Sequence, residues 1–252
     1  MATNNGHEGN GKGRVRLDGT DKDAAKAAQD FKVVGRPFRK VDARSKCVGA
    51  TKFADDIALP RMLYCKILRS HVPHALIKSI DVSKALALPG VHAVITGRDL
   101  PVPYGILPVS QDETALCVEK VRFIGDPVAA VAAVDEDTAF DAMNLIEVEY
   151  EPLGTVATIE EAVETSEPRI HDYGDYNNVH KSVHLEFGDM DEGFQAADLV
   201  REDTFFYEGN THLPMEQHAA VAHYDADDKI TLWSSTQTPH YVHRALAKTL
   251  GM

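Results

Sequence analysis

The pattern of apolar and polar positions changes near residue 33. Residues 1–32 are rich in Gly, Asn, Lys, Asp and Ala and carry almost no large apolar side chains, so burial cannot repay the entropy of ordering them. They also lack the apolar region of a secretory leader. We therefore predict a disordered tail over residues 1–32. From Val33 onward, short β-branched runs alternate with short helical patterns between Pro and Gly residues, and folded structure is expected to start there.

A first set of elements is expected before residue 153. The shorter ones are strands over 62–68, 91–95 and 148–150 and one or two helical turns over 82–88. Val128–Val134 is a continuous apolar run, which is typical of a strand buried on both faces. We place this run at the centre of a sheet. Asp135 follows it as a suitable N-cap for an amphipathic helix, so the local order is strand, helix, strand.

The pattern breaks at Glu151–Gly154, where we predict a domain boundary between residues 153 and 154. The elements expected beyond it are a short helix from 188 to 199, strands over 204–207, 219–223 and 230–235, and a terminal helix over 239–250. Thr238 and Pro239 have the residue types of an N-cap and a first helical position, and Gly251 is suited to end the helix. Gln237 therefore lies between a strand and a helix.

Charge and cysteine content exclude several classes of protein. The net charge of −13 opposes the phosphate backbone, so nucleic acid is not expected as a partner. No run approaches the roughly 18 apolar residues of a membrane-spanning helix, so membrane insertion is not expected. Cys47, Cys65 and Cys117 are far apart and form no Cys-x-x-Cys pair, which excludes a visible zinc or iron–sulfur ligand set. Free thiols are typical of a reducing compartment, and we expect a cytoplasmic protein.

Two groups of polar residues are candidates for a binding site. Gln237 is predicted to lie where the carboxyl end of a strand meets the positive amino end of a helix, a favoured place for anions. Its amide can hold an oxo group, a carbonyl or a phosphate, although its position alone also fits a capping or loop glutamine. The second group consists of His212, Glu216 and His218, with His240 and His243 nearby. Its spacing matches no metal-ligand motif, and structural polar contacts are the favoured interpretation.

Several phrases follow one another along the chain. They are Arg44–Ile57, Leu68–Ala75, Leu88–Gly97, Val121–Ala129, Glu149–Leu153, Gly188–Asp189, Met215–Glu216 and Trp233–Gln237. In this order they resemble the large subunit of the xanthine oxidase family, the molybdenum hydroxylases. The first phrase departs mildly from the family pattern, because Cys47 and Val48 replace a valine and a threonine. The resemblance covers residues 36–252.

The resemblance implies an α+β protein. A hammerhead-like α/β domain, here over residues 33–153, is followed by the start of a molybdopterin-binding α/β domain over 154–252, which is incomplete. In the family, the glutamine of the Ser-Thr-Gln phrase lies beside the molybdenum centre and interacts with an oxo ligand. The resemblance therefore implies a cofactor-binding role for Gln237 and a supporting role for Glu216. It implies no catalytic residue in this chain, and none that coordinates the metal directly.

The resemblance also implies cofactors and partners. The cofactor is molybdenum–molybdopterin in its cytosine dinucleotide form, with iron–sulfur clusters and FAD on partner subunits. The sequence stops at Met252, before the glycine-rich phrase and the carboxyl-terminal glutamate base of the family. The expected partners are therefore the remainder of the molybdenum subunit, an iron–sulfur subunit and a flavin subunit, in a cytoplasmic complex. The chain alone is expected to be inactive.

Two questions stay open at the level of sequence. Residues 101–108 and 236–243 look most like the 4-hydroxybenzoyl-CoA reductase alpha subunit, which implies reductive dehydroxylation of an aromatic CoA thioester. Most of the family instead hydroxylate an electron-poor carbon of an aromatic or heteroaromatic substrate. The second question is the class of function, because a non-catalytic assembly or scaffold module, or a truncated product, is an alternative to the enzyme subunit. Self-association through the apolar side of the helix over 239–250 would favour that alternative.

Overall fold

A computed structural model describes residues 32–105, 107 and 111–252. The tail predicted over 1–32 lies outside the described residues except for Lys32, as do residues 106 and 108 of the phrase at 101–108. The chain divides into two compact units, one ending at Phe53 and the other spanning Ala54–Met252. The described part of the first unit carries helix α2 (Ala43–Cys47) and no buried side chain. The core lies in the second unit, which opens with the short helix η1 (Ala54–Asp56).

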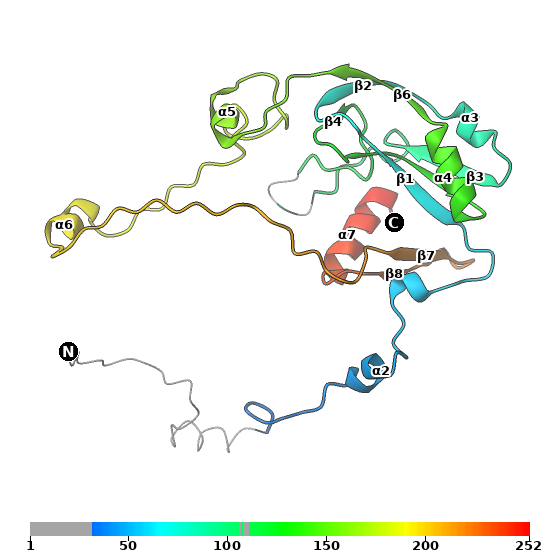
Figure 1. Ribbon diagram of the computed structural model, residues 1–252, viewed down its shortest axis with the longest axis horizontal. Helices are drawn as coiled ribbons and strands as arrows, with labels where there is room; N and C mark the ends of the chain where they lie inside the picture. Colours follow the sequence, from blue (N-terminus) through cyan, green and yellow to red (C-terminus); the bar gives the residue numbers. More distant parts are fainter. Residues whose placement is uncertain (1–31, 106, 108–110) are drawn as a thin grey trace, which may run out of the picture. The chain divides into compact units, whose positions relative to one another are not determined.

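The first sheet is built around strand β5 (Pro127–Ala133), which pairs antiparallel on both sides (Figure 1). Its neighbours are β1 (Tyr64–Arg69) and β3 (Val91–Thr96), in the order β1-β5-β3. The predicted central position of the apolar run at Val128–Val134 is therefore confirmed. Successive side chains of β5 enter different core clusters, which explains why the run is apolar at almost every position.

The second sheet has the order β4-β2-β6 and is also antiparallel. Its strands are β4 (Lys120–Val121), β2 (Ala75–Asp81) and β6 (Glu147–Pro152). The predicted strand, helix, strand succession is present, but β5 and β6 belong to different sheets. Val128 of β5 packs with Ala75 and Val121 of this sheet in one buried cluster, so the two sheets share a core.

Helices α3 (Ser83–Leu86) and α4 (Glu136–Asn144) pack in the cluster of the first sheet. Asp135 caps α4 as predicted, because its carboxylate accepts a hydrogen bond of 2.7 Å from the backbone N–H of Thr138. Ala139 and Ala142 of α4 are fully buried, and β5 is rich in alanine. Small side chains on both elements let the helix lie close to the strand.

Gly97, at the end of β3, marks a close approach of two backbone segments. A Cβ atom added at this position would lie 2.2 Å from the carbonyl oxygen of Cys117 and 2.5 Å from its carbonyl carbon. Real Cβ atoms do not come so near to backbone atoms, so this crossing requires glycine. The N–H of Cys117 in turn donates to Pro127 O of β5 at 2.7 Å, which ties the crossing to the central strand.

The second half of the chain is sparser in structure. Its elements are α5 (Ile159–Glu164), α6 (Met190–Gln195), β7 (Ala220–Tyr224), β8 (Ile230–Ser234) and α7 (Pro239–Leu250). The strand predicted over 204–207 is wrong for the structure, in which these residues form neither helix nor strand. Phe205, Phe206 and Tyr207 are 82–90% exposed. A strand needs a hydrogen-bonded neighbour, and none pairs with this segment in the described part of the chain.

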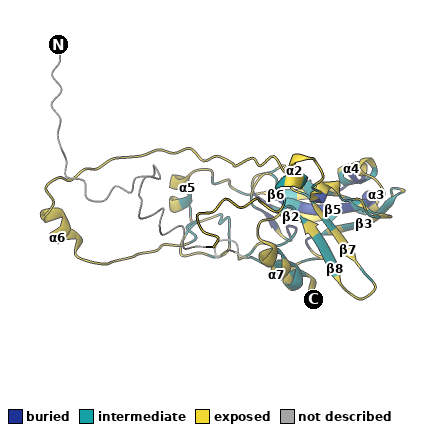
Figure 2. Ribbon diagram, turned by 90° about the horizontal axis from the view of Figure 1, so that it is seen from below, coloured by how far each residue is buried: buried dark blue, intermediate teal, exposed yellow. Residues whose placement is uncertain are grey.

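Figure 2 shows that the buried residues gather in the two sheets with α3 and α4, whereas α5, α6 and the chain on either side of α6 are exposed. The predicted α+β class is confirmed by this mixture of antiparallel sheets and helices. Within the described residues, no helix is both long enough and apolar enough to cross a membrane.

Candidate cofactor-binding site

The predicted site lies in a small unit made of β7, β8 and α7. The two strands pair antiparallel, from Ala220 opposite Ser234 to Tyr224 opposite Ile230. Asp225 closes the turn between them, because its carboxylate accepts hydrogen bonds from the N–H groups of Asp227 and Lys229, each at 3.0 Å. This Asx-type turn reverses the chain between the two predicted strands, so that β8 leads directly into α7.

Gln237 lies in the short link from β8 to α7. Before it, Ser235 is fastened to the other strand, because its N–H donates to Ala219 O at 3.0 Å and its hydroxyl accepts from Ala219 N at 2.9 Å. After it, the N–H of Thr238 donates to the hydroxyl of Thr236 at 3.1 Å. These bonds fix the backbone on both sides of Gln237, whose own side chain is exposed. Gln237 therefore occupies the strand–helix junction, while its role in cofactor binding stays a prediction.

The amino end of α7 differs from the prediction in its capping. Thr238 is the N-cap residue and Pro239 the first helical residue, but the Thr238 side chain makes no capping hydrogen bond. Its hydroxyl lies 3.3 Å from that of Thr236 instead. The positive end of this helix is thus not neutralised by its own N-cap side chain. At the other end, Gly251 takes the left-handed conformation, with φ 69°, and ends the helix as predicted.

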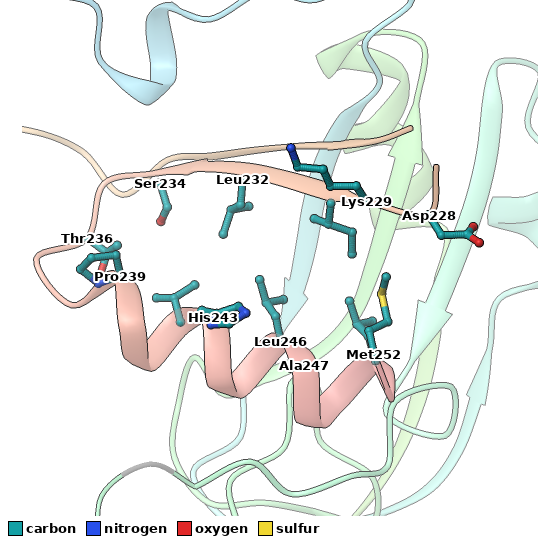
Figure 3. Close-up of a pocket in the computed structure, with 13 residues that line it drawn as sticks. Asp228, Lys229, Leu232, Ser234, Thr236, Pro239, His243, Leu246, Ala247 and Met252 are labelled. Carbon is teal, nitrogen blue, oxygen red and sulfur yellow. The ribbon is translucent and has the colours of Figure 1, made fainter. Parts of the chain in front are cut away.

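A cavity of about 530 Å³ lies between β8 and α7 (Figure 3). Ile230 and Leu232 of the strand and Val242 and Leu246 of the helix line it, and Figure 3 shows Leu232 and Leu246 on its two sides. This lining confirms the predicted apolar side of α7. Such a lining offers few donors to a phosphate or an oxo group and suits apolar side chains. Ser234 and Thr236 line the end of the cavity that adjoins the link with Gln237, and Asp228 and Lys229 line the opposite end. The hydroxyls of Ser234 and Thr236, with the nearby amide of Gln237, fit an oxo or phosphate ligand better than the apolar middle of the cavity does.

Glu216 lies in a stretch, residues 208–218, that forms neither helix nor strand. Its side chain is exposed, as are those of His212 and His218. Within the described residues, no group of three or more His, Cys, Asp or Glu side chains is arranged to hold a metal ion. The structure thus gives Glu216 no geometric partner from which a role can be argued, and its supporting role stays a prediction.

A group of charged residues around β4 was not predicted from the sequence. Lys120, whose side chain is 9% exposed, donates to the carboxylate of Asp172 at 3.0 and 3.2 Å and to Arg169 O at 3.0 Å. Arg122 lies 3.0 Å from a carboxylate oxygen of Asp112. We call these residues, together with His171, the β4 charge cluster.

The β4 charge cluster fastens residues 169–172 to the second sheet. His171 Nδ1 lies 3.0 Å from the Asp112 carboxylate, and Arg122 Nε donates to Ile170 O at 3.1 Å. Burial by itself raises the pKa of Asp172, but the hydrogen bonds and charge of Lys120, with Arg122, hold that pKa below its ordinary value. The sequence signal for this cluster was the alternation of basic and apolar residues at 120–122, which is typical of a strand. A lysine that is buried in a strand needs a carboxylate partner.

The three cysteines are unpaired, as expected. Cys117 is buried, whereas Cys47 and Cys65 are exposed. Burial raises the pKa of the Cys117 thiol well above its ordinary value, and the nearby carboxylate of Asp126 adds to the effect. A thiol with a raised pKa is a poor nucleophile, so Cys117 acts as a core residue.

Comparison with known proteins identifies two domains along the chain. Residues 48–154 match the family model of the aldehyde oxidase and xanthine dehydrogenase a/b hammerhead domain. Residues 170–252 match the molybdopterin cofactor-binding domain. The chain belongs to the xanthine oxidase family of molybdenum hydroxylases. The predicted architecture, a hammerhead domain followed by the start of a molybdopterin-binding domain, is thereby confirmed, while the boundary between residues 153 and 154 stays a prediction.

Several members of the xanthine oxidase family align with most of the chain. The nicotinate dehydrogenase large molybdopterin subunit of Eubacterium barkeri is 41% identical over 224 residues, which are 89% of this chain and 52% of that protein. Quinoline 2-oxidoreductase from Pseudomonas putida 86 gives a TM-score of 0.69 at 31% identity, over 86% of this chain and 28% of that one. Aldehyde oxidoreductase from Desulfovibrio gigas gives a TM-score of 0.75 at 28% identity, over 86% of this chain and 25% of that one. The chain thus spans about half the length of the nicotinate dehydrogenase subunit, and a smaller share of the others.

Proposed function

We propose that this chain is the amino-terminal part of the molybdenum-cofactor-binding subunit of a molybdenum-dependent oxidoreductase. The observation that carries the proposal is the match of residues 170–252 to the molybdopterin cofactor-binding domain. The exposed Gln237 at the start of α7 supports it. The chain spans 52% of the nicotinate dehydrogenase subunit and 28% of quinoline 2-oxidoreductase, so the activity proposed is that of the whole large subunit.

In this proposal, the chain positions one edge of the cofactor. When bound, molybdenum–molybdopterin supplies oxygen transfer coupled to the transfer of two electrons. The amide of Gln237 donates a hydrogen bond to an oxo group and fixes its orientation, while the positive end of α7 favours the negative charge there. The hydrogen bonds of Ser235 and Thr236 hold the link in place before the cofactor binds. Glu216 takes a supporting role in cofactor binding.

The substrate in this proposal is a nitrogen heteroaromatic compound, which is hydroxylated at an electron-poor carbon. The names of two relatives, nicotinate dehydrogenase and quinoline 2-oxidoreductase, support this class of substrate. We further propose the cytosine dinucleotide form of the cofactor. In this proposal, iron–sulfur clusters and FAD on partner subunits of a cytoplasmic complex would accept the electrons.

A second candidate reaction is the reductive dehydroxylation of an aromatic CoA thioester. Residues 101–108 and 236–243 favour it, through their resemblance to the 4-hydroxybenzoyl-CoA reductase alpha subunit. Hydroxylation oxidises the substrate, whereas dehydroxylation reduces it. Turnover of a heteroaromatic substrate with an electron acceptor would therefore support the first reaction, and turnover of the thioester with a reductant would support the second. The non-enzymatic alternative is a non-catalytic assembly module, which would carry no cofactor.

The decisive experiment is the purification of the chain from its native host with whatever is bound to it. We expect close to one molybdenum per chain by elemental analysis, and release of cytidine monophosphate on acid hydrolysis. Mass spectrometry should identify the remaining part of the large subunit in the same preparation. A preparation that contains that part but no molybdenum would overturn the enzyme proposal and leave the assembly module.

A further inference from the structure

Residues 154–169, which we call the connector, lead from the hammerhead domain toward the cofactor-binding domain. Gly154 is the last residue of the match to the first domain, and residue 170 is the first of the match to the second. The two ends of the connector lie against each other, because a Cβ added at Gly154 would be 3.2 Å from Cδ of Pro168. The connector is therefore a closed loop, and the contacts at its base keep it closed.

The two ends of the connector are fastened by different chemistry. At its end, Lys120 of the β4 charge cluster donates to Arg169 O at 3.0 Å. At its beginning, Nδ1 of His74 lies 2.8 Å from Gly154 O, and the N–H of Leu153 donates to His74 O at 2.9 Å. His74 is only 3% exposed, so this contact is shielded from water. A single buried imidazole thus holds the chain where it leaves β6.

The contact with Gly154 fixes which nitrogen of His74 carries the proton. A carbonyl oxygen only accepts hydrogen bonds, so Nδ1 is the donor, and Nε2 is the unprotonated nitrogen of the neutral ring. Nε2 is buried, and within the described residues it has no hydrogen-bond partner. A proton added at Nε2 would create a buried imidazolium whose new N–H has no acceptor, which is costly. The closed connector therefore favours the neutral ring.

The titratable groups on the segments next to His74 do not compensate such a charge. These groups are His71, Cys117, Glu119, Lys120, Asp126, Tyr150, Glu151 and Glu167. Three of the carboxylates have other partners: Glu151 pairs with Lys78, Asp126 accepts the N–H of Arg122 at 2.9 Å, and Glu167 accepts that of Arg169 at 3.3 Å. In the part of the chain that the structure describes, none of the four carboxylates forms a hydrogen bond with Nε2.

We propose that His74 is an acid-sensitive latch of the connector. The neutral imidazole holds Gly154, and uptake of one proton at Nε2 breaks this contact and frees the beginning of the connector. The stabilisation by the neutral ring is complete above the range in which an imidazole titrates, about pH 6.5, and is lost as the pH falls through that range. The end of the connector stays fastened there. Burial by itself raises the pKa of Asp172, but the hydrogen bonds and charge of Lys120 hold it below its ordinary value, so this pair keeps its charges.

The test is hydrogen–deuterium exchange of the full chain from about pH 7.5 to about pH 5.5. Protection factors are compared, because they remove the direct effect of pH on the rate of exchange. The amide of Leu153, which donates to His74 O, should lose at least about tenfold of its protection. The amide of Ile170, which donates to Asn178 Oδ1 at 2.7 Å, should lose less than about twofold. Unchanged protection of Leu153 would overturn the inference, and so would equal losses at the two amides, which indicate general unfolding.

Two variants that introduce the same residue assign the effect to His74. His74→Asn keeps an N–H donor near the position of Nδ1 but cannot titrate, so Leu153 should lose less than about twofold of its protection on acidification. His71→Asn, in the same loop but exposed, should leave the tenfold loss unchanged. A tenfold loss that persists in His74→Asn would overturn the inference. If asparagine fails to hold Gly154 even at neutral pH, the comparison of Leu153 with Ile170 in the unchanged chain and in His71→Asn still decides.

Discussion

Replacement of Gly97 by alanine should unfold part of the hammerhead core, and its effect can be worked out from the distances around it. The new Cβ would lie 2.2 Å from Cys117 O and 2.8 Å from Leu116 O. An unstrained contact needs about 3.5 Å, so one backbone segment has to move by roughly 1 Å. That movement breaks the 2.7 Å hydrogen bond from Cys117 to β5 and loosens the cluster around Val121 and Val128.

We estimate the cost at about 3 kcal/mol, from overpacking of a well-packed site and one buried backbone hydrogen bond. For a domain of this size the melting temperature should fall by about 12 °C or more, measured by circular dichroism. Gly193→Ala is the matched control, because nothing lies within 4 Å of a Cβ there and the residue is in α6. A loss of less than about 3 °C for Gly97→Ala would contradict the predicted clash of the new Cβ with the backbone at Cys117.

Three further predictions follow from the core and the β4 charge cluster. Val131→Ala should lower the free energy of unfolding by about 2–3 kcal/mol in urea titrations, because Val131 is fully buried, whereas Val134→Ala, at a position 47% exposed, should cost much less. Lys120→Met should lower the free energy of unfolding by only about 1 kcal/mol, because the exposed carboxylate of Asp172 stays hydrated without its partner. Limited proteolysis of this variant should show faster cleavage near residue 170, and unchanged cleavage would contradict the role of Lys120 in holding residues 169–172. The pKa of Asp172 is lowered in the folded chain, so its ion pair with Lys120 contributes fully to stability above about pH 5, and this contribution is lost as the pH falls through the lowered pKa. The free energy of unfolding of Lys120→Met should therefore fall less on acidification than that of the unchanged chain. An equal fall for both proteins would contradict a stabilising ion pair between Lys120 and Asp172.

The elements that depend on local signals could be predicted from the sequence. The run at Val128–Val134, the cap at Asp135 and the link from β8 to α7 were found because periodicity and capping chemistry act over a few residues. The predicted strand over 204–207 failed for a different reason. Its side chains favour a strand, but pairing is a long-range condition, and the described residues supply no partner.

The candidate site was predictable in position and not in detail. The sequence located Gln237 at the junction, since a strand pattern, a threonine and a proline surround it. It did not indicate that Thr238 leaves the helix without a side-chain cap, because that depends on the hydroxyl contact with Thr236. The β4 charge cluster was missed because its members, Asp112 and Lys120 on one side and Asp172 on the other, are brought together by tertiary structure.

We propose that this chain meets the molybdenum cofactor at the junction between β8 and α7. The most direct measurement is the structure of the molybdenum-loaded assembly from the native host, at a resolution that defines side-chain amides. We expect the amide of Gln237 to lie within hydrogen-bonding distance, about 2.7–3.2 Å, of an oxo ligand of the metal. A molybdenum centre bound elsewhere, with Gln237 still exposed to solvent, would contradict a cofactor-binding role for this junction.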